Sequence, residues 1–116
     1  MLDAGSESRG KSAMKVLQIV PRDGRRFYDS IIRKQDDIRK NGRGTFSRSG
    51  PRRKNAAHWV HAKYSGSIDL ARSSGVVTAK VKSRDKVDES NLSRAFLGWI
   101  DRHFGGDLLS VTIEYR

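Results

Sequence analysis

The chain has 116 residues and a formal net charge of +11, from 24 Lys and Arg against 13 Asp and Glu. It contains no cysteine, which excludes disulfide bonds, thiolate catalysis and zinc sites built on thiolates. The chain has no apolar run of the about 20 residues that span a bilayer, and its polar N-terminus lacks the apolar core of a secretory signal. These features predict one soluble, basic, cytoplasmic domain without a membrane partner.

The N-terminal third predicts a tail, a strand and a helix. Residues 1–13 are polar, and we expect a disordered tail there, so that the single domain spans 14–116. The apolar run at 14–20, closed by Pro21, predicts a strand. Phe27, Ile31, Gln35 and Ile38 recur at helical spacing with charged residues between them, which predicts a helix over about 25–39.

A basic segment rich in Gly and Ser follows at 40–56. It has neither helical nor strand periodicity, so we expect a flexible loop. Residues 38–68 hold 8 basic and 0 acidic residues and therefore carry +8 of the net +11. Seven of these cations repel one another between 39 and 54, and a polyanion that neutralised them would stabilise the segment; they are Arg39, Lys40, Arg43, Arg48, Arg52, Arg53 and Lys54.

Two more strands are predicted after the basic segment. Alternation over 58–72 indicates one long strand, with Val60 and Ile68 facing the core and Trp59 and His61 facing outward. Residues 73–75 form a hairpin turn. The strand at 76–83 then places Val77, Ala79 and Val81 inward and Thr78, Lys80 and Lys82 outward.

The C-terminal third predicts a strong helix and a last strand. Leu92, Phe96, Trp99 and Ile100 fall on one helical face, Asp88 can cap the N-terminus, and Gly105 ends the helix. Glu89 favours the positive end of the helix dipole. The final stretch alternates apolar and polar residues, which predicts a half-buried strand with one apolar face made by Leu109, Val111, Ile113 and Tyr115.

The predicted order is therefore β-α-β-β-α-β. Two split β-α-β units of this kind form an α+β sandwich, in which a four-stranded antiparallel sheet carries both helices on one face. This is the ferredoxin-like architecture. Its other face would be open to solvent and basic, and we expect Trp59, His61, Lys63 and Lys80 on it.

An open basic face beside a basic loop predicts a small, non-catalytic nucleic-acid-binding protein. The loop at 39–54 would contact phosphates and Trp59 would stack on a base, whether the ligand is RNA or DNA. The expected contact residues are Arg43, Arg48, Arg52, Arg53 and Lys54, with Trp59, Lys63 and Lys80 in support.

Two alternatives stay open. The chain could be a protein-interaction module, an assembly subunit or an inhibitor of another factor, whose basic loop meets an acidic partner; it could also form a homodimer through a sheet edge. The second alternative is a small enzyme acting on a phosphorylated substrate. Arg22, Arg25 and Arg26 surround the N-terminus of the first helix and form a weaker candidate anion site there.

The histidines do not predict a metal site. His58 and His61 are three residues apart, and side chains at that spacing on a strand point to opposite faces. We interpret both as structural, and the sequence predicts neither a metal nor a cofactor.

Overall fold

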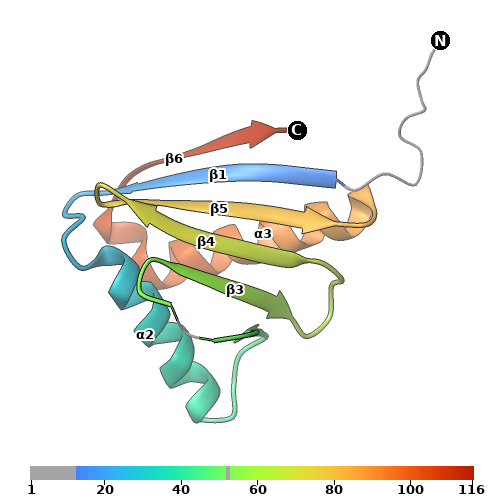
Figure 1. The fold of residues 1–116 in the computed structure, drawn as a ribbon, viewed down its shortest axis with the longest axis horizontal. Helices are drawn as coiled ribbons and strands as arrows, with labels where there is room; N and C mark the ends of the chain where they lie inside the picture. Colours follow the sequence, from blue (N-terminus) through green and yellow to red (C-terminus); the bar gives the residue numbers. More distant parts are fainter. Residues whose placement is uncertain (1–12, 52) are drawn as a thin grey trace.

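The computed structural model describes residues 13–51 and 53–116. The predicted tail lies outside the described residues except for Ala13, and so does the predicted contact residue Arg52. The elements in chain order are β1 (Ala13–Pro21), α2 (Phe27–Lys40), β2 (Phe46–Arg48), β3 (Ala56–His61), β4 (Ser67–Ser73), β5 (Val76–Ser83), α3 (Lys86–Phe104), a 3-10 turn (Gly105–Asp107) and β6 (Leu108–Tyr115) (Figure 1).

Six strands form one antiparallel sheet in the order β2-β3-β4-β5-β1-β6. The predicted α+β class is confirmed, and the described residues form two helices beside the sheet. The four-stranded ferredoxin-like layout is not confirmed. The sheet has more strands because the long strand predicted at 58–72 is two strands, β3 and β4, and because the basic segment contributes β2.

The turn at 62–66 separates β3 from β4. Gly66 has φ +118, and a Cβ there would lie 2.2 Å from a backbone carbonyl oxygen of β5, so the turn needs a glycine. The chain reverses at this turn and places Trp59 directly opposite Ile68, on the same face of the sheet. The predicted outward position of Trp59 and His61 is therefore wrong, because alternation assigns faces only within one unbroken strand.

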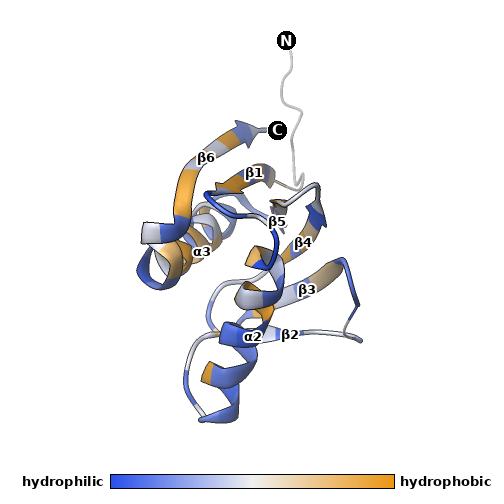
Figure 2. Ribbon diagram, turned by 90° about the vertical axis from the view of Figure 1, so that its left-hand side faces the viewer, coloured by the Kyte–Doolittle hydropathy of each residue, from blue (hydrophilic) through white to orange (hydrophobic). Residues whose placement is uncertain are grey.

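Both helices pack on one face of the sheet. Figure 2 shows α3 on one side of β1, β5 and β4, and α2 packs beside β2. The core lies between the two layers, and its centre is Trp59, which is 0% exposed and packs edge-on against Phe96 and Trp99. We call the opposite side of the sheet the open face; it is the side turned to the viewer in Figure 1.

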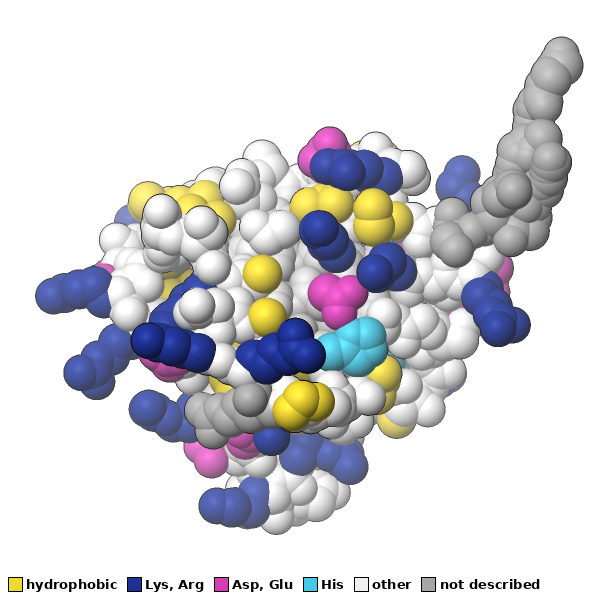
Figure 3. Space-filling model, in the orientation of Figure 1, with side chains coloured by type: hydrophobic (Ala, Val, Ile, Leu, Met, Phe, Trp, Pro, Cys, Tyr) yellow, Lys and Arg dark blue, Asp and Glu magenta, His cyan; other side chains and the backbone are white. Residues whose placement is uncertain are grey.

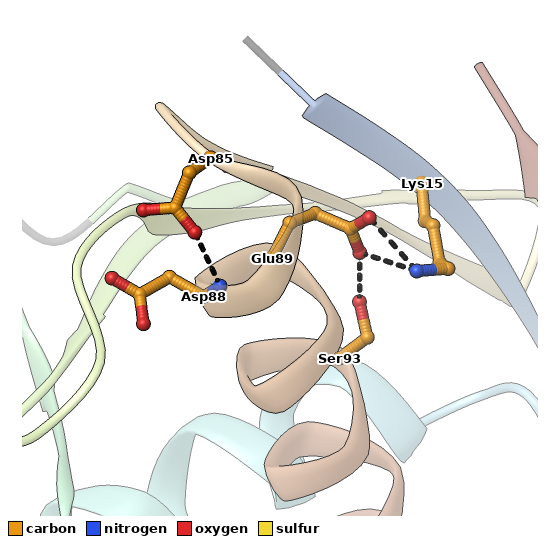
Figure 4. Close-up of polar contacts among 5 residues, drawn as sticks. All are labelled: Lys15, Asp85, Asp88, Glu89 and Ser93. Atoms are coloured by element: carbon orange, nitrogen blue, oxygen red, sulfur yellow. Dashed lines mark hydrogen bonds and ion pairs between the residues drawn. The ribbon is translucent and has the colours of Figure 1, made fainter.

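A buried ion pair joins α3 to β1 (Figure 4). The Lys15 ammonium donates to both carboxylate oxygens of Glu89, at 2.8 and 2.7 Å, and the Ser93 hydroxyl donates to the same carboxylate at 2.6 Å. The side chain of Glu89 is 4% exposed and that of Lys15 is 13% exposed. Glu89 therefore pairs with a strand, and its predicted role at the helix dipole is not its main contact.

The N-terminus of α3 is capped by Asp85, not by Asp88 as predicted. The Asp85 carboxylate accepts the backbone N–H of Asp88 at 2.7 Å, and the helix begins at Lys86 (Figure 4). Asp88 lies in the first turn instead, and its carboxylate accepts a hydrogen bond from the hydroxyl of Ser65 at 2.8 Å.

Two further ion pairs join α2 to the sheet. Arg48 of β2 contacts Asp36 at 2.8 Å, and Arg72 of β4 contacts Asp29 at 3.3 Å. Like Lys15, these arginines point to the helix-facing side of the sheet. Cations on that side therefore meet carboxylates supplied by the helices.

The last strand, β6, is an edge strand that the helices leave uncovered. We expected a half-buried strand, but Leu109, Ile113 and Tyr115 are 61%, 39% and 74% exposed. The reason is that α3 packs on β5 and β1. Only Leu108 and Val111 of β6 pack against the core.

Candidate nucleic-acid interface

A cleft of about 520 Å³ lies on the open face, where residues 49–51 and Arg53 lie beside β3, β4 and β5. Ser49, Gly50, Pro51 and Arg53 line it from the basic segment. The strands contribute small side chains to its floor and polar side chains to its rim.

Both ends of the cleft's outer wall are hydrogen-bonded to the sheet. The backbone N–H of Ser49 donates to the carbonyl of His58 at 2.7 Å, and the N–H of Arg72 donates to the carbonyl of Asn55 at 3.0 Å. The guanidinium of Arg72 also donates to the Asn55 side chain at 2.9 Å. These contacts fix where the wall leaves and rejoins the sheet.

The segment predicted as a loop at 40–56 contains the short strand β2. Phe46 in β2 is 3% exposed and contacts the rings of Trp59 and Phe96. The buried side chain of Gln35 donates to the Phe46 carbonyl at 3.1 Å. One apolar side chain in a polar segment therefore attaches the segment to the core.

The floor of the cleft is part of an uncharged row of cross-strand neighbours that crosses the open face. The row continues from β3 to β6, as each residue is paired with the next: Ala56, Ala71, Thr78, Gln18 and Thr112. Short side chains at its β3 end leave a depression between the basic segment and the charged row beside it. A chain with an anionic backbone could lie there without meeting an acidic floor.

The charged row beside it begins with a hydrogen-bonded triad. His58 Nδ1 lies 2.5 Å from one carboxylate oxygen of Asp69, and Lys82 Nζ lies 3.1 Å from the other. Burial acts to raise the pKa of Asp69, but the hydrogen bonds from His58 and Lys82 outweigh it, and the pKa is lowered. Asp69 is therefore an anion that pairs with the Lys82 ammonium and accepts a hydrogen bond from His58, and Nε2 of the half-exposed His58 ring points to no described partner.

Two cations of the cleft have no carboxylate partner among the described residues. Arg53 reaches the cleft from the basic segment, and Lys80 reaches it from β5, directly opposite Asp69. Figure 3 looks onto the open face and shows basic side chains gathered around histidine and acidic side chains. The cleft is therefore the place where predicted contact residues from the segment and from the sheet come together.

The structure moves two predicted contact residues away from this face. Trp59 is in the core and cannot stack on a base. Arg48 faces α2, where Asp36 neutralises it. Both corrections have the same cause, since each side chain lies on the helix-facing side of its strand.

The remaining predicted residues are exposed but scattered. Arg43 follows the C-terminus of α2, and Lys63 lies in the turn at 62–66 over the ring of Tyr64. Lys54 lines a shallow hollow beside α2 with Tyr28. The sequence reasoning missed His58 and Asp69 as site residues. The predicted alternation already turned Asp69 outward, and reversing it before the turn at 62–66 places His58 on the open face as well.

The two histidines do point to opposite faces, as predicted. His61 lies on the helix-facing side, stacked on Tyr64 with ring centroids 4.8 Å apart. Its Nδ1 accepts the backbone N–H groups of Lys63 and Tyr64 at 3.0 and 3.3 Å. Burial, and then the nearby charge of Lys63, lower the pKa of His61.

The arginines at the N-terminus of α2 share their pocket with acidic groups. Arg22, Arg25 and Arg26 line it together with Asp23 and Asp107. The Arg25 guanidinium lies 2.9 Å from Asp23, and this hydrogen bond lowers the pKa of Asp23 to about 2. Because the Asp23 carboxylate already pairs with Arg25, and Asp107 also lines the pocket, the weaker anion site stays a prediction.

No protein-family model matches this chain, and a search of curated proteins found no match. Within residues 13–51 and 53–116, no three His, Asp or Glu side chains are grouped so that they could hold a metal ion. No helix in the same residues is long and apolar enough to cross a membrane.

Proposed function

We propose that the protein binds nucleic acid in the cytoplasm, without catalysing a reaction, by contacting the phosphate backbone in the cleft on the open face. The observation that carries the proposal is the arrangement of Arg53 and Lys80. These cations flank an uncharged floor, while the neighbouring Asp69 is already paired with Lys82 and hydrogen-bonded to His58. Cations placed in this way gain free energy when a polyanion displaces their counterions.

The open face supports recognition of the backbone and not of the bases. None of the described side chains that the strand register places on this face is Phe, Trp or Tyr. Base stacking, which contributes about 1–3 kcal/mol per base in single-strand binders, therefore has no aromatic platform there apart from the ring of His58. We expect binding that depends strongly on salt and little on sequence, to RNA or DNA.

A salt titration with matched charge variants tests this function. Labelled single- and double-stranded oligonucleotides would be titrated by fluorescence anisotropy between about 50 and 200 mM salt. The variant Arg53→Gln/Lys80→Gln should bind more weakly, and its slope of log affinity against log salt should be shallower by about 1.4–1.8, because two phosphate contacts are lost. The control Arg94→Gln/Arg102→Gln removes the same charge from the exposed side of α3.

Two results would overturn the proposal. One is the absence of binding at low salt. The other is an equal loss of affinity in the cleft variant and the α3 variant, since this would mean that only the total charge matters.

An acidic protein surface is the second candidate ligand. The floor of the cleft includes Ala57 and Leu70 as well as polar groups, so an extended acidic peptide could also lie against it. A poly-glutamate peptide with the same number of charges as the oligonucleotide distinguishes the two ligands. Nucleic-acid binding requires the oligonucleotide to bind more tightly, whereas an interaction module would prefer the peptide.

A further inference from the structure

Among the described residues, no strand pairs with the outer edge of β6, which is the last strand of the sheet. The N–H of Arg116 donates to the carbonyl of Met14 on β1 at 3.1 Å. In an antiparallel ladder, backbone groups face the neighbouring strand at every second residue. The even-numbered residues of β6 therefore bond to β1, and the N–H and C=O groups of Val111, Ile113 and Tyr115 point away from the sheet.

The same strand carries three of the four large hydrophobic side chains that are exposed in the described residues: Leu109, Ile113 and Tyr115. The fourth, Val87, lies in the first turn of α3. Figure 1 shows β6 as the outermost strand on its side of the sheet. A bare edge with apolar side chains is a template for pairing with another strand.

The distribution of charge along the chain favours the β6 edge as the place where two copies can meet. Two molecules of net charge +11 repel one another over most of their surfaces. Residues 107–116, in contrast, hold one basic and two acidic residues, a balance of −1. The β6 edge is therefore a place where a second copy of this chain can approach with little repulsion, and where a polyanion gains nothing.

We propose that two copies of the chain pair along their β6 edges, antiparallel, with the two Thr112 residues facing each other on the two-fold axis. Val111 then lies opposite the partner's Ile113 on the helix-facing side, and Thr112 meets the partner's Thr112 on the open face. The register between β6 and β1 shifts beside Leu109, so the regular pairing covers residues 110–114. Cross-strand pairs of both kinds stabilise antiparallel sheets.

The backbone directions agree with this register. Pairs of outward-facing residues, such as Val111 with the partner's Ile113, can exchange two hydrogen bonds. The alternative register, with Ile113 on the axis, also joins outward-facing residues. It places Glu114 diagonally across from the partner's Glu114, and like charges so close are unfavourable. The register centred on Thr112 offsets them by four residues, which is about 13 Å along the strands.

A dimer of this form would present both open faces on the same side of one continuous sheet, because its two-fold axis is perpendicular to the sheet. The two clefts would then lie about seven strand spacings apart, roughly 34 Å. If the proposed function holds, a nucleic acid long enough to reach both clefts should bind the dimer more tightly than a short one. The dimer itself is proposed independently of that function.

Cysteine cross-linking tests the register directly, because the natural chain has no cysteine. Thr112→Cys places two thiols at a position that does not hydrogen-bond across the interface, where Cα atoms are about 4.5 Å apart, within disulfide range. We expect a disulfide-linked dimer under mild oxidation of the full chain. The control Glu114→Cys keeps its thiols about 13 Å apart and should cross-link much more slowly.

Sedimentation of the nuclease-treated wild type, free of nucleic acid, should give twice the chain mass of 13.1 kDa at high concentration. Ile113→Lys should give a monomer at the same concentration. At low concentrations, where the wild type is also monomeric, the two proteins should have nearly the same unfolding midpoint. A wild type that stays monomeric at several hundred micromolar overturns the proposal, and so do equal cross-linking rates at 112 and 114. Because no nucleic acid is present, neither result bears on the function of the cleft.

Discussion

Removing the cation of the buried ion pair should strongly destabilise the fold. The variant Lys15→Met leaves the Glu89 carboxylate buried, because the Glu89 side chain is only 4% exposed in the wild type. It loses both hydrogen bonds from the ammonium and keeps that from the Ser93 hydroxyl. Breaking a buried pair in this way costs about 3–5 kcal/mol. We expect about 3 kcal/mol, because Lys15 is 13% exposed and water can approach its position.

Urea unfolding followed by the fluorescence of Trp59 and Trp99 measures this loss. A loss of about 3 kcal/mol corresponds to a melting temperature lower by roughly 12–24 °C in a domain of this size. The double variant Lys15→Met/Glu89→Leu removes both charges and should recover to within about 1 kcal/mol of the wild type. The reasoning would be refuted by a single variant that loses less than about 1 kcal/mol, or by a double variant as unstable as the single one.

Three further predictions follow from individual contacts. The pKa of His61 is lowered from 6.5 in the folded protein, so the unfolded chain binds more protons near this pH. The free energy of unfolding should therefore fall as the pH drops below about 6.5. The variant His61→Gln should make the urea midpoint less dependent on pH between pH 5 and 7. Gly66→Ala should cost about 2 kcal/mol or more in urea unfolding, from its φ of +118 and the carbonyl oxygen of β5 beside it. Asp85→Ala should cost about 1 kcal/mol in melting experiments through loss of the cap, and Asp88→Ala about half of that or less.

The sequence predicted the two helices and the inward residues of β5 because these elements are regular over their whole length. Phe27 and Ile31 recur at helical spacing on α2, and Val77, Ala79 and Val81 alternate on β5. Each such pattern depends only on local periodicity. Where the chain is locally regular, the prediction and the structure agree.

The site was predicted less well because the face of a strand depends on where the strand begins. The predicted strand contains a turn at 62–66, and the alternation was read through it without a break. Trp59 was therefore assigned to the open face, where the structure has His58. The position of Phe46 could not be read locally either, because its burial depends on contacts with α3 and with β3 that are distant in sequence. The exposure of β6 has a related cause. Alternation shows that a strand has an apolar side, but it does not show what covers that side.

The two layers of the fold separate the charges of the chain. On the helix-facing side of the sheet a cation is desolvated, and an unpaired charge there would be costly. Lys15, Arg48 and Arg72 accordingly each meet a carboxylate from a helix. The open face carries no such constraint, since its cations remain in contact with water.

On the open face, the acids of the strands are already paired and the cleft is left positive. Asp69 is held by His58 and Lys82, and Glu114 is paired with Arg116 at 3.2 Å. Of the predicted contact residues that the structure describes, Arg53 and Lys80 line the cleft. Attraction of a polyanion should therefore depend on the position of these two residues on the sheet more than on the number of cations in the basic segment. The double variant Lys80→Gln/Ser90→Lys moves one cation from the cleft to α3 and keeps the net charge at +11. It should bind nucleic acid more weakly than the wild type.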